Sequence, residues 1–147
     1  MPKRWVLKMS LVLVVVCAIA VEGQRGRGNQ APPEIDGDWT GTWSTWSPAQ
    51  GAVPAKEICK ELTAKVARKD AIWEAIFEGD CGRPYKYTIK MEGRLVSGVV
   101  MFKGTVDLGP QDGGVFDWIG RATNNEFVGF FTSGPYTGVF NLTRRKQ

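Results

Sequence analysis

The sequence predicts an all-β protein, an eight-stranded antiparallel up-and-down barrel with one cross-strand disulfide. Short apolar runs alternate with turn residues from position 37 to position 144, the span of the expected barrel domain. The connections between these runs are mostly of hairpin length, which favours antiparallel neighbours. Closing eight such strands into a barrel leaves no unpaired edge strand. A sandwich is the alternative, but its Greek-key crossings need longer connections.

The runs themselves define eight expected strands. The first interleaves aromatic with small polar residues, the second alternates apolar with polar residues, and the fourth shows the clearest period of two. The fifth is long and is expected to bend where a glycine permits a bulge, near Gly98 or Gly104. The strands are expected at Gly37–Trp46, Ile58–Arg68, Ile72–Glu78, Tyr85–Met91, Arg94–Asp107, Val115–Ala122, Glu126–Thr132 and Tyr136–Thr143.

Turn-forming residues separate the strands, because glycine, proline, asparagine and aspartate favour the backbone conformations of turns. The expected turns and loops are Pro48 with Gly51–Pro54, Lys69-Asp70, Gly79-Asp80, Glu92-Gly93, Gly109–Gly114, Asn124-Asn125 and Ser133–Pro135. We interpret residues 24–36 as a flexible N-terminal arm, because Gln24–Pro33 has no apolar periodicity.

Residues 1–23 are expected to be a signal peptide. Met1–Lys8 carries three basic residues, and the apolar run Met9–Val21 is 13 residues long, shorter than the roughly 20 residues of a membrane-spanning helix. Ala18–Ala20 and Val21–Gly23 are two alternative cleavage sites with small residues. An uncleaved anchor is the alternative interpretation. We therefore expect export to the periplasm or the extracellular space, with no membrane insertion after cleavage.

The composition excludes several classes of function. The chain has a formal net charge of +4, but this excess comes from the two ends. Residues 37–143 hold 11 basic and 12 acidic residues, so no basic stripe favours a nucleic-acid partner. The absence of histidine excludes Ser-His-Asp and Cys-His catalysis and histidine-ligated zinc. No loop has the spacing of a calcium site, and no nucleophile lies in a pattern with a base. We expect no catalytic residue, no metal, no cofactor and no enzyme activity.

Two cysteines, Cys59 and Cys81, remain once Cys17 leaves with the signal peptide. An even number in an oxidising compartment indicates one disulfide, and two buried free thiols are the alternative. A hairpin that turns at Lys69–Ala71 would place Cys59 directly opposite Cys81, as a cross-strand disulfide requires.

The segment Trp39-Thr40-Gly41-Thr42-Trp43 resembles the opening strand of the calycin barrels, which include avidins, lipocalins and fatty-acid-binding proteins. These families share a Gly-x-Trp whose tryptophan plugs the barrel floor, so the resemblance implies that Trp43 lies at a closed end. It does not imply biotin binding, because Thr45 stands where avidins have an asparagine. Trp118 likewise stands alone where avidins present paired tryptophans.

A second, weaker resemblance is to the small periplasmic metalloprotease inhibitors of Gram-negative bacteria. Cys59, Trp73, Gly79-Asp80 and Cys81 match the layout of that family, in which two cysteines bracket one hairpin. An insertion between Trp43 and Cys59 and the pattern of the last three strands depart from it. The resemblance implies an alternative function, a secreted or periplasmic protease inhibitor acting through an N-terminal segment.

Aromatic side chains are the candidate ligand-binding residues. An eight-stranded barrel has room for its own side chains or for one small ligand, and aromatics dominate small cores, so core filling is the preferred interpretation. We expect a non-enzymatic binding barrel for a small apolar ligand or for an extracytoplasmic protein partner. The candidate residues are Trp39, Trp43, Trp46, Tyr85, Tyr87, Trp118 and Phe131.

Overall fold

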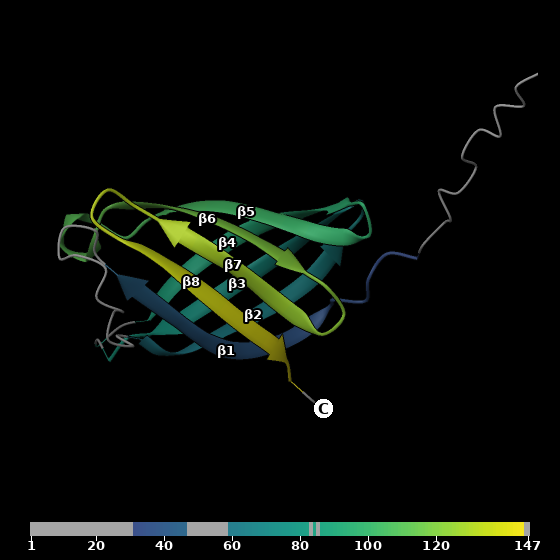
Figure 1. The fold of residues 1–147 in the computed structure, drawn as a ribbon, viewed down its shortest axis with the longest axis horizontal. Helices are drawn as coiled ribbons and strands as arrows, with labels where there is room; N and C mark the ends of the chain where they lie inside the picture. The colour runs from purple at the N-terminus through teal and green to yellow at the C-terminus, as the bar shows by residue number, and fades with distance from the viewer. Residues whose placement is uncertain (1–30, 47–58, 83, 85, 146–147) are drawn as a thin grey trace, which may run out of the picture.

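The computed structural model describes residues 31–46, 59–82, 84 and 86–145, and the strands in them form one closed barrel (Figure 1). Each strand pairs antiparallel with the next, and β8 returns to pair with β1. The all-β class and the up-and-down topology are therefore confirmed. The elements are β1 Gly37–Trp46, β2 Cys59–Lys69, β3 Ile72–Asp80, β4 Tyr87–Val96, β5 Val99–Asp107, the 3-10 turn η2 Pro110–Asp112, β6 Val115–Ala122, β7 Glu126–Thr132 and β8 Thr137–Arg144.

The two ends of the barrel are formed by different connections (Figure 1). The β2–β3, β4–β5 and β6–β7 turns lie at the end where β1 begins, which we call the Trp39 end. The β3–β4, β5–β6 and β7–β8 connections lie at the opposite end, where β1 finishes, which we call the Trp43 end. This alternation follows from the up-and-down topology.

The barrel interior is filled by apolar side chains. Along β6 every second residue is buried, and the described residues include no buried polar or charged side chain. Aromatic rings contact one another along the barrel axis. Trp39 packs edge-on against Phe127, with ring centroids 6.0 Å apart, and Trp43 lies 5.7 Å from Trp118 toward the other end. The core is thus largely aromatic, as the composition led us to expect.

Interior glycines make room for these rings. Gly93 is the strand partner of Phe102, and a Cβ atom on Gly93 would lie 2.5 Å from Phe102 Cε1. A Cβ atom on Gly79 would lie 2.7 Å from Trp43 Cη2. The sequence places both glycines in turns, and both predictions are wrong. They lie inside β4 and β3, because a ring from another strand occupies the space that a side chain would take.

The β4–β5 turn is Ser97-Gly98 instead of Glu92-Gly93. Ser97 has a φ of 48° and Gly98 a φ of 86°, the pair of positive values that a two-residue type I′ hairpin turn requires. The predicted bend near Gly98 is therefore a complete reversal of the chain. As a result, the fourth strand extends to Val96.

The β2–β3 turn, Asp70-Ala71, sets a register that differs from the predicted one. Lys69 pairs with Ile72, and Glu61 pairs with Asp80 at the far end of the ladder. This is one residue away from the register that places Cys59 opposite Cys81, so that prediction of direct pairing is wrong. The reason is that the turn contains two residues and not three.

The last residues of the predicted arm pack against the barrel. The Glu34 backbone N–H donates to Asn124 Oδ1 at 2.9 Å, and Ile35 is fully buried. The Ile35 carbonyl accepts a hydrogen bond from Trp39 Nε1 at 3.0 Å, and the Asp36 carbonyl accepts one from Arg144. Residues 34–36 are thus part of the Trp39 end, because Ile35 fills it. Residues 24–30 of the arm lie outside the described residues.

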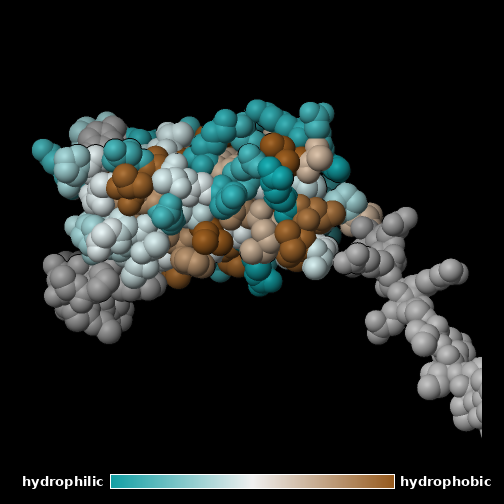
Figure 2. Space-filling model, turned by 90° about the horizontal axis from the view of Figure 1, so that it is seen from above, coloured by the Kyte–Doolittle hydropathy of each residue, from teal (hydrophilic) through white to brown (hydrophobic). Residues whose placement is uncertain are grey.

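The outer surface mixes polar residues with separate apolar patches (Figure 2). One apolar row crosses three strands, because Ile119 pairs with Phe130 and Phe130 pairs with Val139. Each of these three residues is 42–49% exposed. The row lies outside the barrel and takes no part in the core.

Candidate ligand pocket at the Trp43 end

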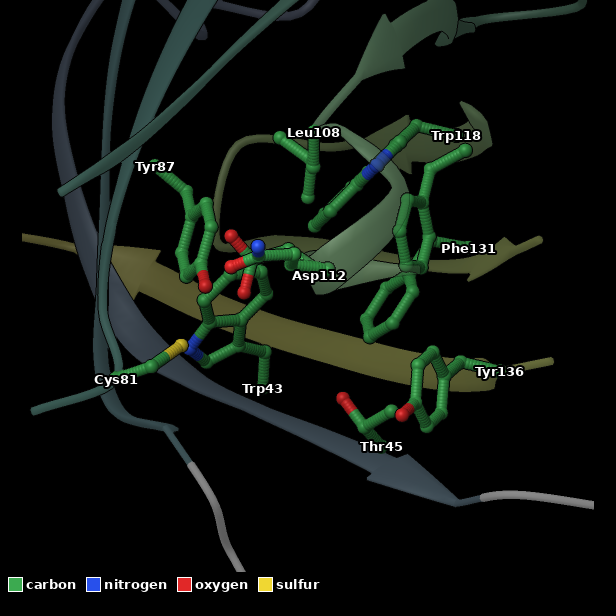
Figure 3. A pocket seen from close by; sticks show the side chains of 11 residues that line it. Trp43, Thr45, Cys81, Tyr87, Leu108, Asp112, Trp118, Phe131 and Tyr136 are labelled. Atoms are coloured by element: carbon green, nitrogen blue, oxygen red, sulfur yellow. The ribbon is translucent and has the colours of Figure 1, made fainter. Parts of the chain in front are cut away.

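A pocket of about 170 Å³ lies at the Trp43 end of the barrel. Its walls come from β1, β4, β6 and β7 and from the three connections at that end (Figure 3). The lining residues are Trp43, Thr45, Cys81, Tyr87, Leu108, Gln111, Asp112, Phe116, Trp118, Phe131 and Tyr136. The middle of the barrel is filled by buried side chains, and this pocket lies beyond them at the Trp43 end.

Aromatic rings form most of the pocket wall. Trp118 and Phe131 are partners on β6 and β7, and their rings stack with centroids 4.5 Å apart and an interplanar angle of 22°. Trp43 contacts Phe131 at 5.8 Å and Tyr87 at 6.2 Å between centroids. Rings held by mutual contacts of this kind lose little freedom when a flat ligand packs against them.

The β5–β6 connection covers one side of the pocket and supplies Leu108, Gln111 and Asp112. Its base is closed by hydrogen bonds from the Leu108 N–H to the Gly114 carbonyl at 3.0 Å and from the Gly114 N–H to the Gly109 carbonyl at 2.8 Å. The Asp107 carboxylate accepts a further bond from the Gly109 N–H at 2.9 Å. The backbone of this connection is therefore fixed where it borders the pocket.

This connection also presses against the β7–β8 connection. Gly113 has a φ of 100°, and a Cβ atom there would lie 2.6 Å from Tyr136 Cδ2. Only glycine combines that backbone conformation with such a close approach. Gly113 therefore allows Tyr136 to lie against the connection and to complete the pocket wall.

Among the described residues that line the pocket, the formal charge is negative. Asp112 is the only lining residue with a formal charge at neutral pH, and neither lysine nor arginine occurs among the described lining residues. The other polar groups that line the pocket are neutral: the side chains of Thr45, Gln111, Tyr87 and Tyr136.

Two indole N–H groups in the pocket wall have no hydrogen-bond partner. Trp43 Nε1 and Trp118 Nε1 are both buried and unpaired. Trp39 Nε1, at the other end of the barrel, donates to the Ile35 carbonyl. A buried donor left unpaired costs about 1–3 kcal/mol. The two tryptophans that line the pocket are thus the two that carry this cost.

The structure brings four of the predicted aromatic residues to the pocket: Trp43, Tyr87, Trp118 and Phe131. Trp39 does not reach it, because β1 carries Trp39 at the opposite end, against Ile35. Trp43, expected to plug a closed end, is buried and lines the pocket, whereas Trp39 fills the other end of the barrel. The Trp46 side chain and Tyr85 lie outside the described residues.

Sequence reasoning missed the loop residues of the pocket, Leu108, Gln111 and Tyr136, and also Phe116 and Thr45. The segment from Asp112 to Gly114 was expected only as a turn. The signal that identifies these residues is topological. In an up-and-down barrel alternate connections meet at one end, so the β5–β6 and β7–β8 connections must lie near the end of β1.

Within the described part of the chain, no group of three or more His, Cys, Asp or Glu side chains could hold a metal ion. Asp117 accepts a hydrogen bond from Thr105 Oγ1 at 2.7 Å on the barrel exterior.

In the same described segments, no helix has the length and apolar character that a membrane crossing requires.

No family model matches the chain, and no curated protein matches it. Among solved structures, the barrel is similar to a crystal structure of a mutant of the fluorescent protein UnaG. The two sequences are 12% identical, the match covers 77% of this chain and 97% of that chain, and the TM-score is 0.43. A resemblance this distant assigns no ligand to the chain.

Proposed function

We propose that the protein is an exported, non-enzymatic binding barrel of calycin-like type, which holds a small apolar ligand at the Trp43 end. The observation that carries the proposal is the aromatic-walled cavity at one end of an otherwise filled barrel. Small-molecule sites are typically concave and largely apolar, with a few polar groups that fix orientation. Trp43, Trp118 and Phe131 supply the apolar wall, while Gln111 and Asp112 supply polar groups.

The size of the cavity limits the size of the ligand. Its volume is about 170 Å³, whereas drug-sized ligands occupy pockets of roughly 300–1,000 Å³. An apolar cavity of about 150 Å³ is known to accept benzene. The enclosed space therefore accommodates about one ring with a short substituent.

A matched pair of substitutions on β1 tests the proposal. Thr45 lines the pocket, whereas Thr42 is exposed on the same strand. Thr45→Trp should fill the cavity, and Thr42→Trp should leave it open. We expect tryptophan fluorescence titrations with toluene to show saturable binding to the wild type and to Thr42→Trp, with at least a tenfold loss for Thr45→Trp. Equal binding by all three proteins would contradict the proposal.

We also propose that Cys59 and Cys81 form a disulfide after export. The backbone register places Cys59 opposite Trp43, and Cys81 lines the same pocket as Trp43. This arrangement supports the pairing without the direct cross-strand register. The Met9–Val21 run supports passage to the oxidising compartment in which such a bond persists. The mass and N-terminal sequence of the exported protein test this part of the proposal.

A further inference from the structure

We infer that the apolar group held in this pocket is the end of a larger, polar molecule. One ring, or a branched alkyl group of that size, enters the barrel, and the polar remainder stays outside at the Trp43 end. The ligand class is thus an amphiphile with a single small apolar end group. The inference rests on the proposed function, because it names the class and the orientation of the ligand in the same pocket.

The floor of the pocket, on the side of Trp118, is closed. Trp118 packs against Phe77 with ring centroids 6.1 Å apart. Phe77 in turn lies 5.1 Å from Phe127, and Phe127 lies 6.0 Å from Trp39 at the opposite end of the barrel. Each of these four rings is at most 1% exposed. A continuous series of buried ring contacts therefore fills the barrel beneath the pocket, and a ligand cannot extend toward the Trp39 end.

Exposure and polarity increase together from the floor to the mouth of the pocket. Four aromatic residues of the lining are buried: Trp43, Phe116, Trp118 and Phe131. In contrast, every lining residue that carries a hydroxyl, amide or carboxylate group is at least partly exposed: Thr45, Tyr87, Gln111, Asp112 and Tyr136. Gln111 and Tyr136 are the most exposed of them, and both belong to connections at the barrel end. The mouth is therefore polar and borders solvent.

The volume of the pocket decides how much of a ligand enters. It is about 170 Å³, less than the roughly 300–1,000 Å³ of a usual small-molecule pocket, so it encloses one part of a ligand. Because the floor is closed, any further part must leave past Gln111 and Tyr136. Figure 3 shows Tyr136 and Thr45 on the side of the pocket away from Trp118. A group that leaves there meets water and polar side chains, which favours a polar group over an apolar one.

Three benzyl ethers test this orientation: benzyl methyl ether, the benzyl ether of tetra(ethylene glycol), and a two-sided ether that carries the same glycol chain at both para positions of the ring. We expect the first two to bind within about threefold of each other, because the glycol chain stays outside. The two-sided ether should bind at least about tenfold more weakly, since one of its chains would have to enter the apolar floor. The affinities are measured by fluorescence titration and by calorimetry.

A spin-labelled probe locates the polar part of the ligand in the wild-type protein, so this measurement does not depend on the folding of a variant. A nitroxide is joined to the benzyl group through a single ethylene glycol unit. It should broaden the side-chain amide resonances of Gln111 at the mouth much more strongly than those of Asn124. Asn124 is the matched control, because it is an exposed side-chain amide in the β6–β7 turn at the Trp39 end. The probe with its nitroxide reduced provides the reference spectrum.

The outcomes distinguish this inference from the proposed function. If the one-sided glycol ether bound tenfold more weakly than the methyl ether, the pocket would enclose its ligand completely, and the inference would be overturned while the binding function stood. Equal binding of the two-sided ether would overturn it as well, because the ring would then lie across an open groove. Broadening of Asn124 as strong as that of Gln111 would contradict the orientation. Failure of both toluene and benzyl methyl ether to bind would overturn the proposed function too.

Discussion

Trp43 lies directly over Gly79, so that the indole ring of β1 occupies the side-chain space of a residue on β3. This contact fixes one wall of the pocket, because Trp43 also touches Tyr87 and Phe131. A glycine and an aromatic ring together thus decide the shape of the Trp43 end.

Gly79→Ala should destabilise the barrel by about 1–3 kcal/mol, because the added methyl group overlaps the Trp43 ring and forces it to move. Urea unfolding measures the change. Gly134→Ala is the matched control, since a Cβ atom there meets nothing within 4 Å. If both variants were as stable as the wild type, the close packing of Trp43 on Gly79 would be refuted.

Trp43→Ala should lower both stability and ligand affinity. Trp43 is 5% exposed, and truncation of a buried aromatic residue typically costs about 3–5 kcal/mol. Since the ring also lines the pocket, toluene binding should weaken even at temperatures where the variant stays folded. Trp39→Ala serves for comparison, because its ring lies at the other end. It should lose stability to a similar extent but keep its affinity for toluene.

Glu74 should make stability depend on pH in the acid range. Lys69 donates to its carboxylate at 2.8 Å, and Lys90 contacts it at 2.6 Å. The hydrogen bond from Lys69, followed by that from Lys90, lowers the pKa of Glu74 below its ordinary value of 4.5. The stabilisation is therefore fully present above pH 4.5 and is lost as the pH falls through the lower, folded-state pKa.

Urea unfolding of the wild type and of Glu74→Gln measures this effect. The two proteins should differ at neutral pH, and the difference should disappear once the pH is well below the folded-state pKa. Lys90→Met, which removes one of the two partners, should reduce the difference. A constant difference at every pH would show that the ion pairs are not its source.

The proposed disulfide, together with the proposed removal of residues 1–23, predicts a protein without a free thiol. Titration of the denatured, unreduced exported protein with a thiol reagent should give a value near zero, because the proposed signal peptide contains Cys17. The double variant Cys59→Ser, Cys81→Ser should unfold at lower denaturant concentration than the wild type. Two reactive thiols per chain in the wild type would instead support buried free cysteines.

The arm separates the proposed function from the protease-inhibitor alternative. A truncation that begins at Glu34 keeps the bond to Asn124 and the buried Ile35, so stability and toluene affinity should stay unchanged. Ile35→Ala should cost about 2–5 kcal/mol, because it empties the Trp39 end. Thermal unfolding and a panel of secreted proteases provide the measurements. An inhibition shown by the full-length protein and lost on truncation would favour the inhibitor.

The bounds of a strand could be predicted well where apolar and polar residues alternate and a typical turn sequence follows. The sixth and seventh strands, Val115–Ala122 and Glu126–Thr132, have the predicted bounds, because apolar and polar residues alternate up to a clear Asn-Asn or Ser-Gly-Pro break. Gly79 and Gly93 misled the prediction, since an isolated glycine has the same sequence signature in a turn as beneath an aromatic ring. Only contacts with residues of other strands tell the two apart.

The candidate site could be predicted in part for the same reason. Trp43, Tyr87, Trp118 and Phe131 stand out as large aromatic residues at inward positions of strands, but Trp39 has the same signature and lies at the other end of the barrel. Residues of the connections, such as Gln111 and Tyr136, carry no local signal at all. Their place in the pocket depends on which loops meet in space.

By itself, the sequence determined the class, the number of strands and their order, because periodicity and turn chemistry are local properties of the chain. The tertiary structure decided which end each tryptophan occupies, which glycines lie beneath rings and which indole N–H groups find a partner. These features depend on contacts between residues far apart in the chain. Barrel closure fixes such contacts through strand register, and a shift of one residue, as in the Asp70-Ala71 turn, changes which residues pair across the hairpin.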